Sequence, residues 1–356
     1  MRALPLIAAV TSALTFVFTF GQKNARAQNA DALSQQVQTI FNRCKNAVVK
    51  IEASDEHGDL SGTGFFIDPN GTLYTCFSVG GESRDIVVCN GEQKYPATRL
   101  AADPRSGIAI LKVDAHNENQ PFLPIGKSRE LRVASMVMTI AYPMDFPVTP
   151  NVGCVGGFEM RSGGFFFATT HIRANVPVQR GEGGAPLLNM NGEAVGVLVS
   201  SMDGGSSGCF ALPIEAAEKV RKDFMRFGEV RPGWLGIKFN TAASLASEIP
   251  RETDGSTVEI EDFVENAPAA KSGLEKGDVL LAVGSTEIKT PDDVLNAAFY
   301  LTPGDEVPIT VWREGSGKMT FNVQPGDHPD APRHTAANPL RSVVPTMSGL
   351  PLKANR

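Results

Sequence analysis

Histidine and cysteine, the residues that most often bind transition metals or react through a thiol, are scarce in this 356-residue sequence. It contains five of each. No pair of these residues stands at the spacing of a zinc site, so the sequence predicts no metal and no other cofactor. Long apolar runs are also missing after the first 20 residues, and no later segment predicts a membrane-spanning helix. We therefore expect a soluble mature protein without stable membrane insertion.

Basic charge is also scarce. The formal net charge is −6, from 33 basic and 39 acidic residues. Residues 1–27 hold three basic residues and no acidic one, so the remaining chain keeps 30 basic against 39 acidic residues, a net charge of −9. An acidic surface repels phosphate groups, which argues against nucleic acid and anionic membranes as main partners.

The first residues follow the pattern of a secretory signal peptide. Arg2 precedes an apolar stretch from Leu4 to Phe20, and Ala25-Arg26-Ala27 is a small-x-small cleavage pattern. The alternative is a membrane anchor, but the stretch is shorter than the roughly 20 residues of a spanning helix and is diluted by hydroxyl residues. We expect a signal peptide over residues 1–27 and export across the inner membrane.

The cysteines permit disulfides in an exported protein but do not fix their pairing. Their odd number leaves at least one thiol unpaired in a monomer. Two of them fall on successive predicted strands and are the first pair to test, namely Cys76 and Cys89. The alternative is that all five are small buried hydrophobic residues: Cys44, Cys76, Cys89, Cys154 and Cys209.

The pattern of the mature chain begins helical and then changes to that of strands. Residues 28–46 place Leu33, Val37 and Phe41 at helical spacing, which predicts an amphipathic helix. Short apolar or alternating runs follow, separated by turn sequences such as Asp68-Pro-Asn-Gly71. With 35 glycines and 24 prolines, this indicates a mainly β fold built from antiparallel barrels or a sandwich.

Two further changes of pattern divide the rest of the chain. A helical pattern over Pro213–Phe224 closes the first β-rich unit, and the second unit contains one helix, expected at Pro291–Leu301. The last thirty residues contain five prolines and no period, which is typical of disorder. The expected organisation is a first unit over 47–228, a linker over 229–232, a second unit over 233–325 and a disordered tail over 326–356.

Three stretches of the sequence carry family-specific motifs. They are Gly62-Thr-Gly-Phe-Phe-Ile-Asp-Pro-Asn-Gly-Thr-Leu-Tyr-Thr75, Asp103-Pro-Arg-Ser-Gly-Ile-Ala-Ile-Leu-Lys112 and Gly181-Glu-Gly-Gly-Ala-Pro-Leu-Leu188. In this order and spacing they resemble the HtrA (Deg) family of trypsin-like proteases, over roughly residues 45–325. The resemblance implies a trypsin-like double antiparallel β-barrel followed by a PDZ domain, trimeric assembly and a periplasmic location.

The resemblance also locates the three positions that carry catalytic side chains in the family. Ser78 stands in place of the histidine, Gly107 in place of the aspartate and Gly183 in place of the serine nucleophile. Glycine has no side-chain atom to attack a carbonyl, and a serine hydroxyl is not a base near neutral pH. The resemblance therefore implies no catalytic residue, and it leaves a vestigial oxyanion turn at Gly181, Glu182 and Gly183.

A shift of the alignment by one or two residues does not restore the triad. No serine or threonine occurs between Thr170 and Ser200, so no neighbouring hydroxyl can replace the nucleophile. No histidine occurs between His57 and His116, so no neighbouring imidazole can replace the base.

A displaced catalytic group is the other alternative. His171 precedes Gly183 by about a dozen residues, on a strand that lines the substrate pocket in the family. Cys76 and Glu182 are further candidates to face the cleft. A Cys76–His171 pair is conceivable, whereas a lone histidine on a strand is more often structural or solvated.

A peptide-binding loop is implied in the second unit. Gly233-Trp-Leu-Gly-Ile237 and Ala267-Pro-Ala-Ala-Lys-Ser-Gly-Leu-Glu-Lys-Gly-Asp-Val-Leu-Leu281 resemble the bacterial type of PDZ domain. Such a loop donates backbone N–H groups to a terminal carboxylate while the peptide adds as a strand. The expected peptide-binding residues are Trp234, Leu235, Gly236 and Ile237. The other wall would be the predicted helix, although at least half of its apolar residues must face the core: Val294, Leu295, Ala298 and Phe299.

The expected function is that of an exported, non-catalytic pseudoprotease. It would bind C-terminal or unfolded segments of proteins, as a chaperone-like scaffold, adaptor or regulator, either as a homotrimer or mixed with active relatives. The alternative is an active periplasmic serine endopeptidase of the HtrA type in protein quality control. Two further alternatives concern single sites: the barrel cleft holds a peptide carbonyl without cutting it, or the PDZ loop is filled by a segment of the chain itself.

Overall fold

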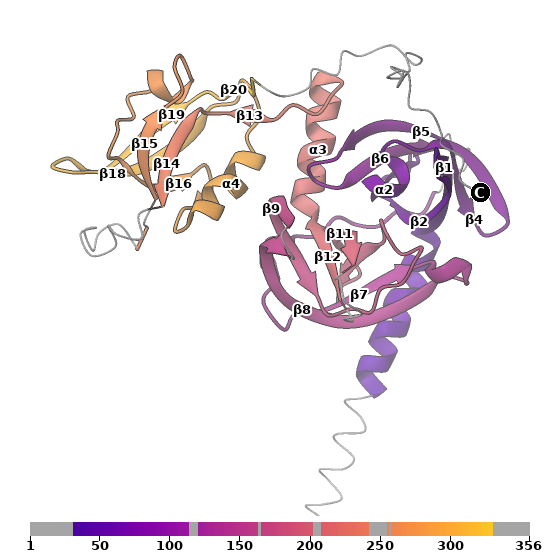
Figure 1. Cartoon of the computed structure of the whole chain (residues 1–356). Coiled ribbons are helices and arrows are strands. Elements are labelled where there is room, and N and C mark those ends of the chain that lie inside the picture. Colours follow the sequence, from indigo (N-terminus) through magenta and orange to yellow (C-terminus); the bar gives the residue numbers. More distant parts are fainter. Residues whose placement is uncertain are drawn as a thin grey trace, which may run out of the picture.

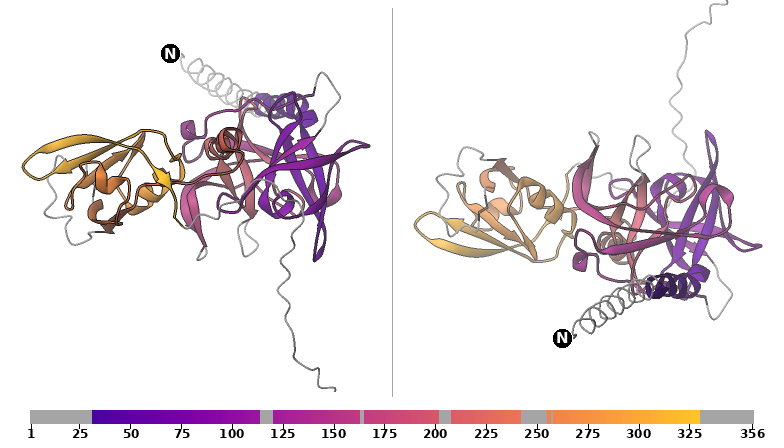
Figure 2. Two further views of the ribbon diagram at one scale, coloured as in Figure 1. Left: turned by 90° about the horizontal axis from the view of Figure 1, so that it is seen from above. Right: turned by 90° about the horizontal axis from the view of Figure 1, so that it is seen from below.

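The computed structural model describes residues 31–113, 120–162, 165–201, 208–241, 255–256 and 258–329. The expected signal peptide at 1–27 and residues 330–356 of the expected tail lie outside these ranges. Two β-barrels and a third β-rich unit follow one another along the molecule, with the third unit beside the second barrel (Figures 1 and 2). In this described part, no helix is both long and apolar enough to cross a membrane.

The chain enters the first barrel through a helix over residues 31–44. Its first half is exposed, whereas Ile40 and Cys44 near its end are buried. Gln36 donates from Nε2 to the carbonyl of Met190 at 3.0 Å, so the helix lies against a turn of the second barrel. The 3-10 turn Lys45–Ala47 then leads into the first strand.

The first barrel closes from six antiparallel strands in the order β1-β2-β3-β6-β5-β4. Along β5 exposed residues alternate with partly buried ones, as expected for a strand with one face toward solvent. A single helical turn, α2 (Phe77–Gly80), joins the third strand to the fourth. The strands are β1 (Val48–Asp55), β2 (Gly58–Phe66), β3 (Thr72–Cys76), β4 (Arg84–Asn90), β5 (Gln93–Asp103) and β6 (Ile108–Val113).

The second barrel repeats this plan in the order β10-β11-β12-β9-β8-β7. Short 3-10 turns precede and follow its first strand, at Ser128–Glu130 and Pro143–Asp145. The strands are β7 (Met136–Ala141), β8 (Thr149–Ser162), β9 (Phe165–Ala174), β10 (Pro186–Asn189), β11 (Ala194–Ser201) and β12 (Cys209–Pro213). The expectation of a mainly β protein with a trypsin-like double antiparallel barrel is confirmed.

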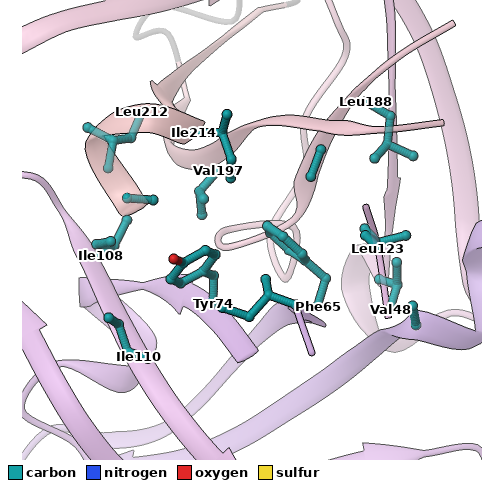
Figure 3. Packing of buried hydrophobic residues seen from close by; sticks show 14 of the residues in the cluster. Val48, Phe65, Tyr74, Ile108, Ile110, Leu123, Leu188, Val197, Leu212 and Ile214 are labelled. Carbon is teal, nitrogen blue, oxygen red and sulfur yellow. The ribbon is translucent and has the colours of Figure 1, made fainter. Parts of the chain in front are cut away.

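One apolar cluster joins the two barrels. Tyr74 and Phe65 of the first barrel lie in it together with Val197 and Leu212 of the second (Figure 3). The Tyr74 hydroxyl is buried and donates to a carboxylate oxygen of Glu218 at 2.5 Å. Because burying apolar surface contributes about 25 cal/mol per Å² and the tyrosine hydroxyl keeps a partner, this cluster holds the barrels in a fixed relation.

The helix that supplies this carboxylate, α3 (Ile214–Phe227), runs along both barrels. It buries Ile214, Ala217 and Val220 along one face, which is the amphipathic pattern of the sequence. It ends at Gly228, whose φ of 75° is the left-handed conformation that closes many helices.

The third unit is a sheet in the order β14-β15-β16-β18-β19, in which β14 is an edge strand among the described residues. Its helix begins at Pro291 behind a capping box, in which the Thr290 hydroxyl accepts from the Asp293 N–H. The helix ends at Phe299 rather than at the expected Leu301. The elements are β14 (Ile237–Thr241), β15 (Val258–Phe263), η5 (Ala269–Lys271), β16 (Val279–Val283), β17 (Thr286–Glu287), α4 (Pro291–Phe299), β18 (Val307–Arg313) and β19 (Gly317–Val323).

The third unit reaches beyond the expected boundary at residue 325. Strand β20 (Gly326–Asp327) pairs with β13 (Gly233–Trp234), and Arg231 forms an ion pair with Asp327. The ring of His328 meets the ring of Trp234 edge-on, with centroids 6.2 Å apart. The expectation of disorder from residue 326 onward is therefore wrong for the first residues of that segment, which are held by β13 and by Arg231 of the linker.

All five cysteines are free thiols, and four of them are buried. The expected first pair does not form, because β3 pairs with β2 and β6 whereas β4 pairs with β1 and β5. Strands that follow one another along the chain are thus not neighbours at this place in the barrel, and Cys76 and Cys89 lie in separate parts of it.

Candidate functional site

A cleft of about 500 Å³ lies on the side where α2 faces the loop between β9 and β10. It brings together residues from segments more than 100 positions apart, including Ser78 of α2 and Gly181 and Gly183 of the loop. The lining consists of Ser61, Ser78, Val79, Val178, Gln179, Arg180, Gly181, Gly183, Leu198, Val199 and Ser200. Two of the three expected triad positions therefore line one cleft.

Ser78 is exposed at the mouth of this cleft, on the second residue of α2. Its hydroxyl lies 3.1 Å from the Sγ atom of Cys76. Burial raises the pKa of the Cys76 thiol, although the Ser78 hydroxyl acts in the opposite direction. The cysteine therefore stays a neutral thiol near neutral pH and is a poor nucleophile.

Gly183 lies directly across from the same sulfur. A Cβ atom built on Gly183 would stand 3.0 Å from Cys76 Sγ, which is closer than ordinary van der Waals contact. The Gly183 carbonyl accepts from the N–H of Thr63 at 2.8 Å, which fixes the end of the loop to the first barrel. Sequence reasoning missed this contact, because Cys76 and Gly183 lie more than 100 positions apart and meet only in the folded chain.

Gly107 lies behind α2 rather than in the cleft lining. Its carbonyl accepts from the N–H of Phe77 at 2.7 Å, and its φ is 75°. A Cβ atom on Gly107 would stand 3.3 Å from the Cβ of Val199, a residue that lines the cleft. The carboxylate of Asp103 nearby is held by Arg105 at 3.0 Å and does not replace the missing side chain.

Glu182 does not face the cleft, contrary to the expectation. Its side chain is buried and accepts from the backbone N–H of Gln179 at 2.7 Å and from Nδ2 of Asn151 at 3.0 Å. Burial raises the pKa of the Glu182 carboxyl, although these two hydrogen bonds lower it. The Glu182 side chain is thus turned inward, where it closes the turn.

The backbone N–H groups of Gly181 and Gly183 have no hydrogen-bond acceptor within the described ranges. Both residues line the cleft, so these donors are available to a ligand. Arg180, the residue before them, is exposed in the same lining, and within the described ranges its guanidinium has no hydrogen-bond acceptor. Sequence reasoning missed Arg180, since only its place beside the turn could have drawn attention to it.

His171 is a buried structural residue of β9. One ring nitrogen, Nδ1, lies 2.8 Å from the carbonyl of Thr169, and the ring stacks on Phe167 with centroids 4.2 Å apart. Burial lowers the pKa of His171 to about 4, although the Thr169 carbonyl acts in the opposite direction. No contact between His171 and Cys76 occurs in the described structure, so the two do not form the conceivable pair.

The expected peptide-binding loop lies between β13 and β14. Leu235 and Gly236 donate no backbone hydrogen bond to any described residue, whereas their carbonyls accept from Ala269 and Val264. Gly236 has a φ of 72°, and a Cβ atom there would stand 2.3 Å from the Cβ of Ala267. The loop therefore needs glycine at this position, and its anchored carbonyls leave the N–H groups unpaired.

The expected helix wall is only partly available to a peptide. Val294 is buried in the core of the third unit, and Phe299 is buried in the cluster that joins the barrels. Asn296 also contacts the second barrel, since its Oδ1 accepts from Oγ1 of Thr169 on β9 at 2.6 Å. This leaves Leu295, which is half-buried and belongs to none of the apolar clusters, as the candidate for the groove.

The comparisons with known protein families divide the chain as the structure does. Residues 62–197 match the trypsin-like peptidase domain, and residues 233–324 match the PDZ domain. No group of three or more metal-ligating side chains occurs in the described part of the chain.

Curated relatives and solved structures agree with this division. A DegP-like periplasmic serine endoprotease of Ectopseudomonas mendocina (strain ymp) is 31% identical over 283 residues, which cover 78% of this chain and 58% of that protein. One from Chlamydia pneumoniae is 29% identical over 281 residues, which cover 78% and 57%. The chain thus spans less than two thirds of their length.

Among solved structures, the HtrA-type protease AlgW with a tripeptide superposes with a TM-score of 0.67 at 24% identity, over 82% of this chain and 97% of that one. The serine endoprotease from Yersinia pestis gives a TM-score of 0.57 at 21% identity, over 82% and 98%. Identity at this level supports the fold alone. Together, the domain matches and the curated relatives identify the chain as a homologue of the DegP/HtrA serine endoproteases, with a trypsin-like peptidase domain followed by a PDZ domain.

Proposed function

We propose that this chain is an exported, non-catalytic HtrA-like protein that binds peptides or unfolded proteins through its PDZ domain. The observation that carries the proposal is the composition of the cleft, whose described lining holds Ser78 and Gly183 but no imidazole, carboxylate or activated nucleophile. In this role the protein acts as a chaperone-like scaffold, adaptor or regulator.

The chemistry of a triad has no substitute among the neighbouring side chains. Cys76 is buried with a raised pKa, and His171 is engaged with Thr169 on β9. In a protease of this mechanism, loss of the triad leaves a rate enhancement of roughly 10³–10⁴ over water, from the oxyanion site and binding alone. That remainder is too small for a working peptidase.

Peptide binding is supported by the edge of the PDZ sheet. Among the described strands β14 pairs with β15 alone, so no described strand covers its other edge, which can accept a further strand. The unpaired N–H groups of Leu235 and Gly236 stand at the start of this edge. A peptide that adds beside β14 would meet them with its terminal carboxylate, which is the geometry of strand addition.

The absence of catalysis is tested with residues 28–356, prepared from a host without related proteases. Casein is the substrate and a fluorophosphonate is the probe for an activated serine. We expect no cleavage and no labelling above the background of heat-denatured protein. Cleavage that co-purifies with the chain, or stoichiometric labelling, would overturn the proposal.

Carboxylate binding by the PDZ loop is tested with Gly236→Ala. Alanine at this position combines a left-handed φ, which costs about 1 kcal/mol, with a clash against Ala267. Gly315→Ala is the matched control, because Gly315 has a φ of 74° but open space around it. We expect Gly236→Ala alone to weaken binding of free-carboxylate peptides by about tenfold or more, as loss of charged hydrogen bonds would. Equal binding of amidated peptides by the unaltered protein would reject the mechanism.

The alternative is an active periplasmic serine endopeptidase, and the names of the curated relatives favour it. The casein and fluorophosphonate experiments separate the two functions directly. Size measurements on the intact protein, alone and mixed with an active relative, would test assembly as a homotrimer or a mixed oligomer. Fractionation of cells would test the periplasmic location that the sequence predicts.

A further inference from the structure

We propose that the cleft between the barrels is a second binding site, which holds the terminal carboxylate of a peptide chain. The donors are the guanidinium of Arg180 and the backbone N–H groups of Gly181 and Gly183. This inference goes beyond the PDZ domain, and it rests on the proposal that the cleft does not hydrolyse peptides.

The charge of the lining selects an anion. Among the residues that the structure describes, the lining contains no aspartate or glutamate, and Arg180 is the one charged residue in it. Arg180 also borders a neighbouring depression that contains carboxylates, but Lys50 holds two of these, Asp145 at 2.7 Å and Glu52 at 2.9 Å. No ion pair joins Arg180 to an acid in the described ranges, so its guanidinium is left for a ligand.

The directions of the two N–H groups follow from the planar trans peptide groups to which they belong. The carbonyl of Arg180 accepts from the N–H of Met144 at 2.7 Å, so the N–H of Gly181 points the opposite way, as a trans peptide requires. The carbonyl of Glu182 accepts from Ala185 at 3.1 Å, which directs the N–H of Gly183 away from that turn. Both donors therefore point away from the anchored side of the loop.

The cleft offers donors for both oxygens of a carboxylate. A carboxylate has two acceptor oxygens, one for the pair of N–H groups and one for the guanidinium, and bonds to an ionised acceptor are about twice as strong as those to a neutral carbonyl. Glu182 does not oppose the anion, because its own carboxylate is buried and held by Asn151 and Gln179.

A chain terminus fits this cleft better than an acidic side chain. The terminal carboxylate lies at the end of the main chain, so the rest of the peptide extends from the cleft in one direction only. An internal aspartate or glutamate would need a chain that continues past the loop on both sides. We therefore commit to the terminal carboxylate as the ligand.

The test uses residues 28–356 with Gly236→Ala, which weakens the PDZ contribution. The ligand is a short Gly-Ser peptide that ends in alanine and carries an N-terminal fluorophore. We expect binding of the free-acid peptide, with a loss of about tenfold for its amidated form. A third peptide, amidated and with aspartate as its last residue, tests the side-chain source. Equal binding of the acid and the amide, or stronger binding of the aspartate peptide, would overturn the inference.

Variants of the cleft locate the site. Arg180→Gln removes the charge, and we expect it to weaken binding of the free acid by about tenfold. Arg84→Gln is the matched control, since Arg84 is exposed on β4 and outside the cleft lining. Ser78→Asp adds a repelling carboxylate, and Ser78→Asn separates this charge from its size. Unchanged binding in both Arg180→Gln and Ser78→Asp would overturn the inference.

A second measurement keeps the test valid if Gly236→Ala does not fold. The same peptide with a photoreactive group beside its last residue is cross-linked to the unaltered protein, and the labelled segments are identified by mass spectrometry. We expect labels both near residues 178–183 and near the PDZ loop. Labels in the PDZ domain alone would overturn the second site. Recovery of the peptide intact or cut reports separately on the proposed lack of hydrolysis.

Discussion

The buried imidazole of His171 predicts a loss of stability in mild acid. Burial lowers its pKa from 6.5 to about 4 in the folded protein. Below pH 6.5 His171 becomes protonated in the unfolded chain, whereas in the folded protein it stays neutral down to about pH 4. The unfolded state binds more protons throughout this window, so the free energy of unfolding must fall as the pH falls.

The size of the effect follows from the two pKa values. One unit of pKa difference between the folded and unfolded states corresponds to about 1.4 kcal/mol in the free energy of unfolding. Because the range from about pH 7.5 to about pH 5 does not reach the folded pKa, only part of the full effect, about 2 kcal/mol, is lost across it. His171 is 1% exposed, so solvent does not screen the effect. This is a sizeable fraction of the roughly 5–15 kcal/mol that stabilises a typical domain.

The assay is urea unfolding of the wild-type protein and of His171→Phe at the two pH values. Phenylalanine keeps the stacking on Phe167 and loses the hydrogen bond to Thr169, so the variant is less stable at both pH values. We expect the wild type to lose about 2 kcal/mol more than the variant between the two pH values, since other titrating groups cancel in this comparison. His57→Gln, at an exposed residue, is the control. Equal losses for the wild type and His171→Phe would refute the reasoning.

Three further predictions follow from single contacts. Titration of the unfolded chain with a thiol reagent, without reductant, should detect five free thiols, and a lower count would contradict the cysteine arrangement. Asn296→Ala should loosen the docking of α4 on β9 and speed limited proteolysis of the interdomain linker several-fold, whereas an unchanged rate would show that this contact is not needed. The triple change Ser78→His, Gly107→Asp and Gly183→Ser should give less casein hydrolysis than the same change with Cys76→Ala, because a side chain at 183 meets the Cys76 sulfur at 3.0 Å. Equal hydrolysis would mean that the sulfur moves aside freely.

Much of the fold could be predicted because its signals are local. Alternating strands and turn sequences lie within short stretches of sequence and predicted a mainly β fold, and the ordered motifs carried the resemblance that implied both barrels and the PDZ domain. The pairing of β13 with β20 could not be predicted, because two-residue strands such as Gly326–Asp327 have no periodicity. The position of Phe299 in the interdomain cluster depends on how two domains dock, which the pattern of one helix does not encode.

The site was harder to predict than the fold for the same reason. The direction of Glu182 is decided by Asn151, about thirty residues away along the chain, which offers its amide inside the barrel. The contact between Cys76 and Gly183 joins the two barrels, and no local sequence pattern around either residue predicts it. The sequence locates the three positions that differ from the family pattern, but only the folded structure shows which atoms lie beside each of them.

The proposed loss of chemistry also has a structural consequence at the two glycines. At Gly107 the backbone adopts a φ of 75°, where a side chain costs about 1 kcal/mol, and Val199 stands 3.3 Å from the place of a Cβ atom. At Gly183 the sulfur of Cys76 stands 3.0 Å from the place of a Cβ atom, closer than ordinary van der Waals contact. Each single reversion would therefore destabilise the fold without restoring catalysis, because the three groups of a triad act only together. A cleft in this state is expected to remain non-catalytic, while its backbone donors stay available for binding.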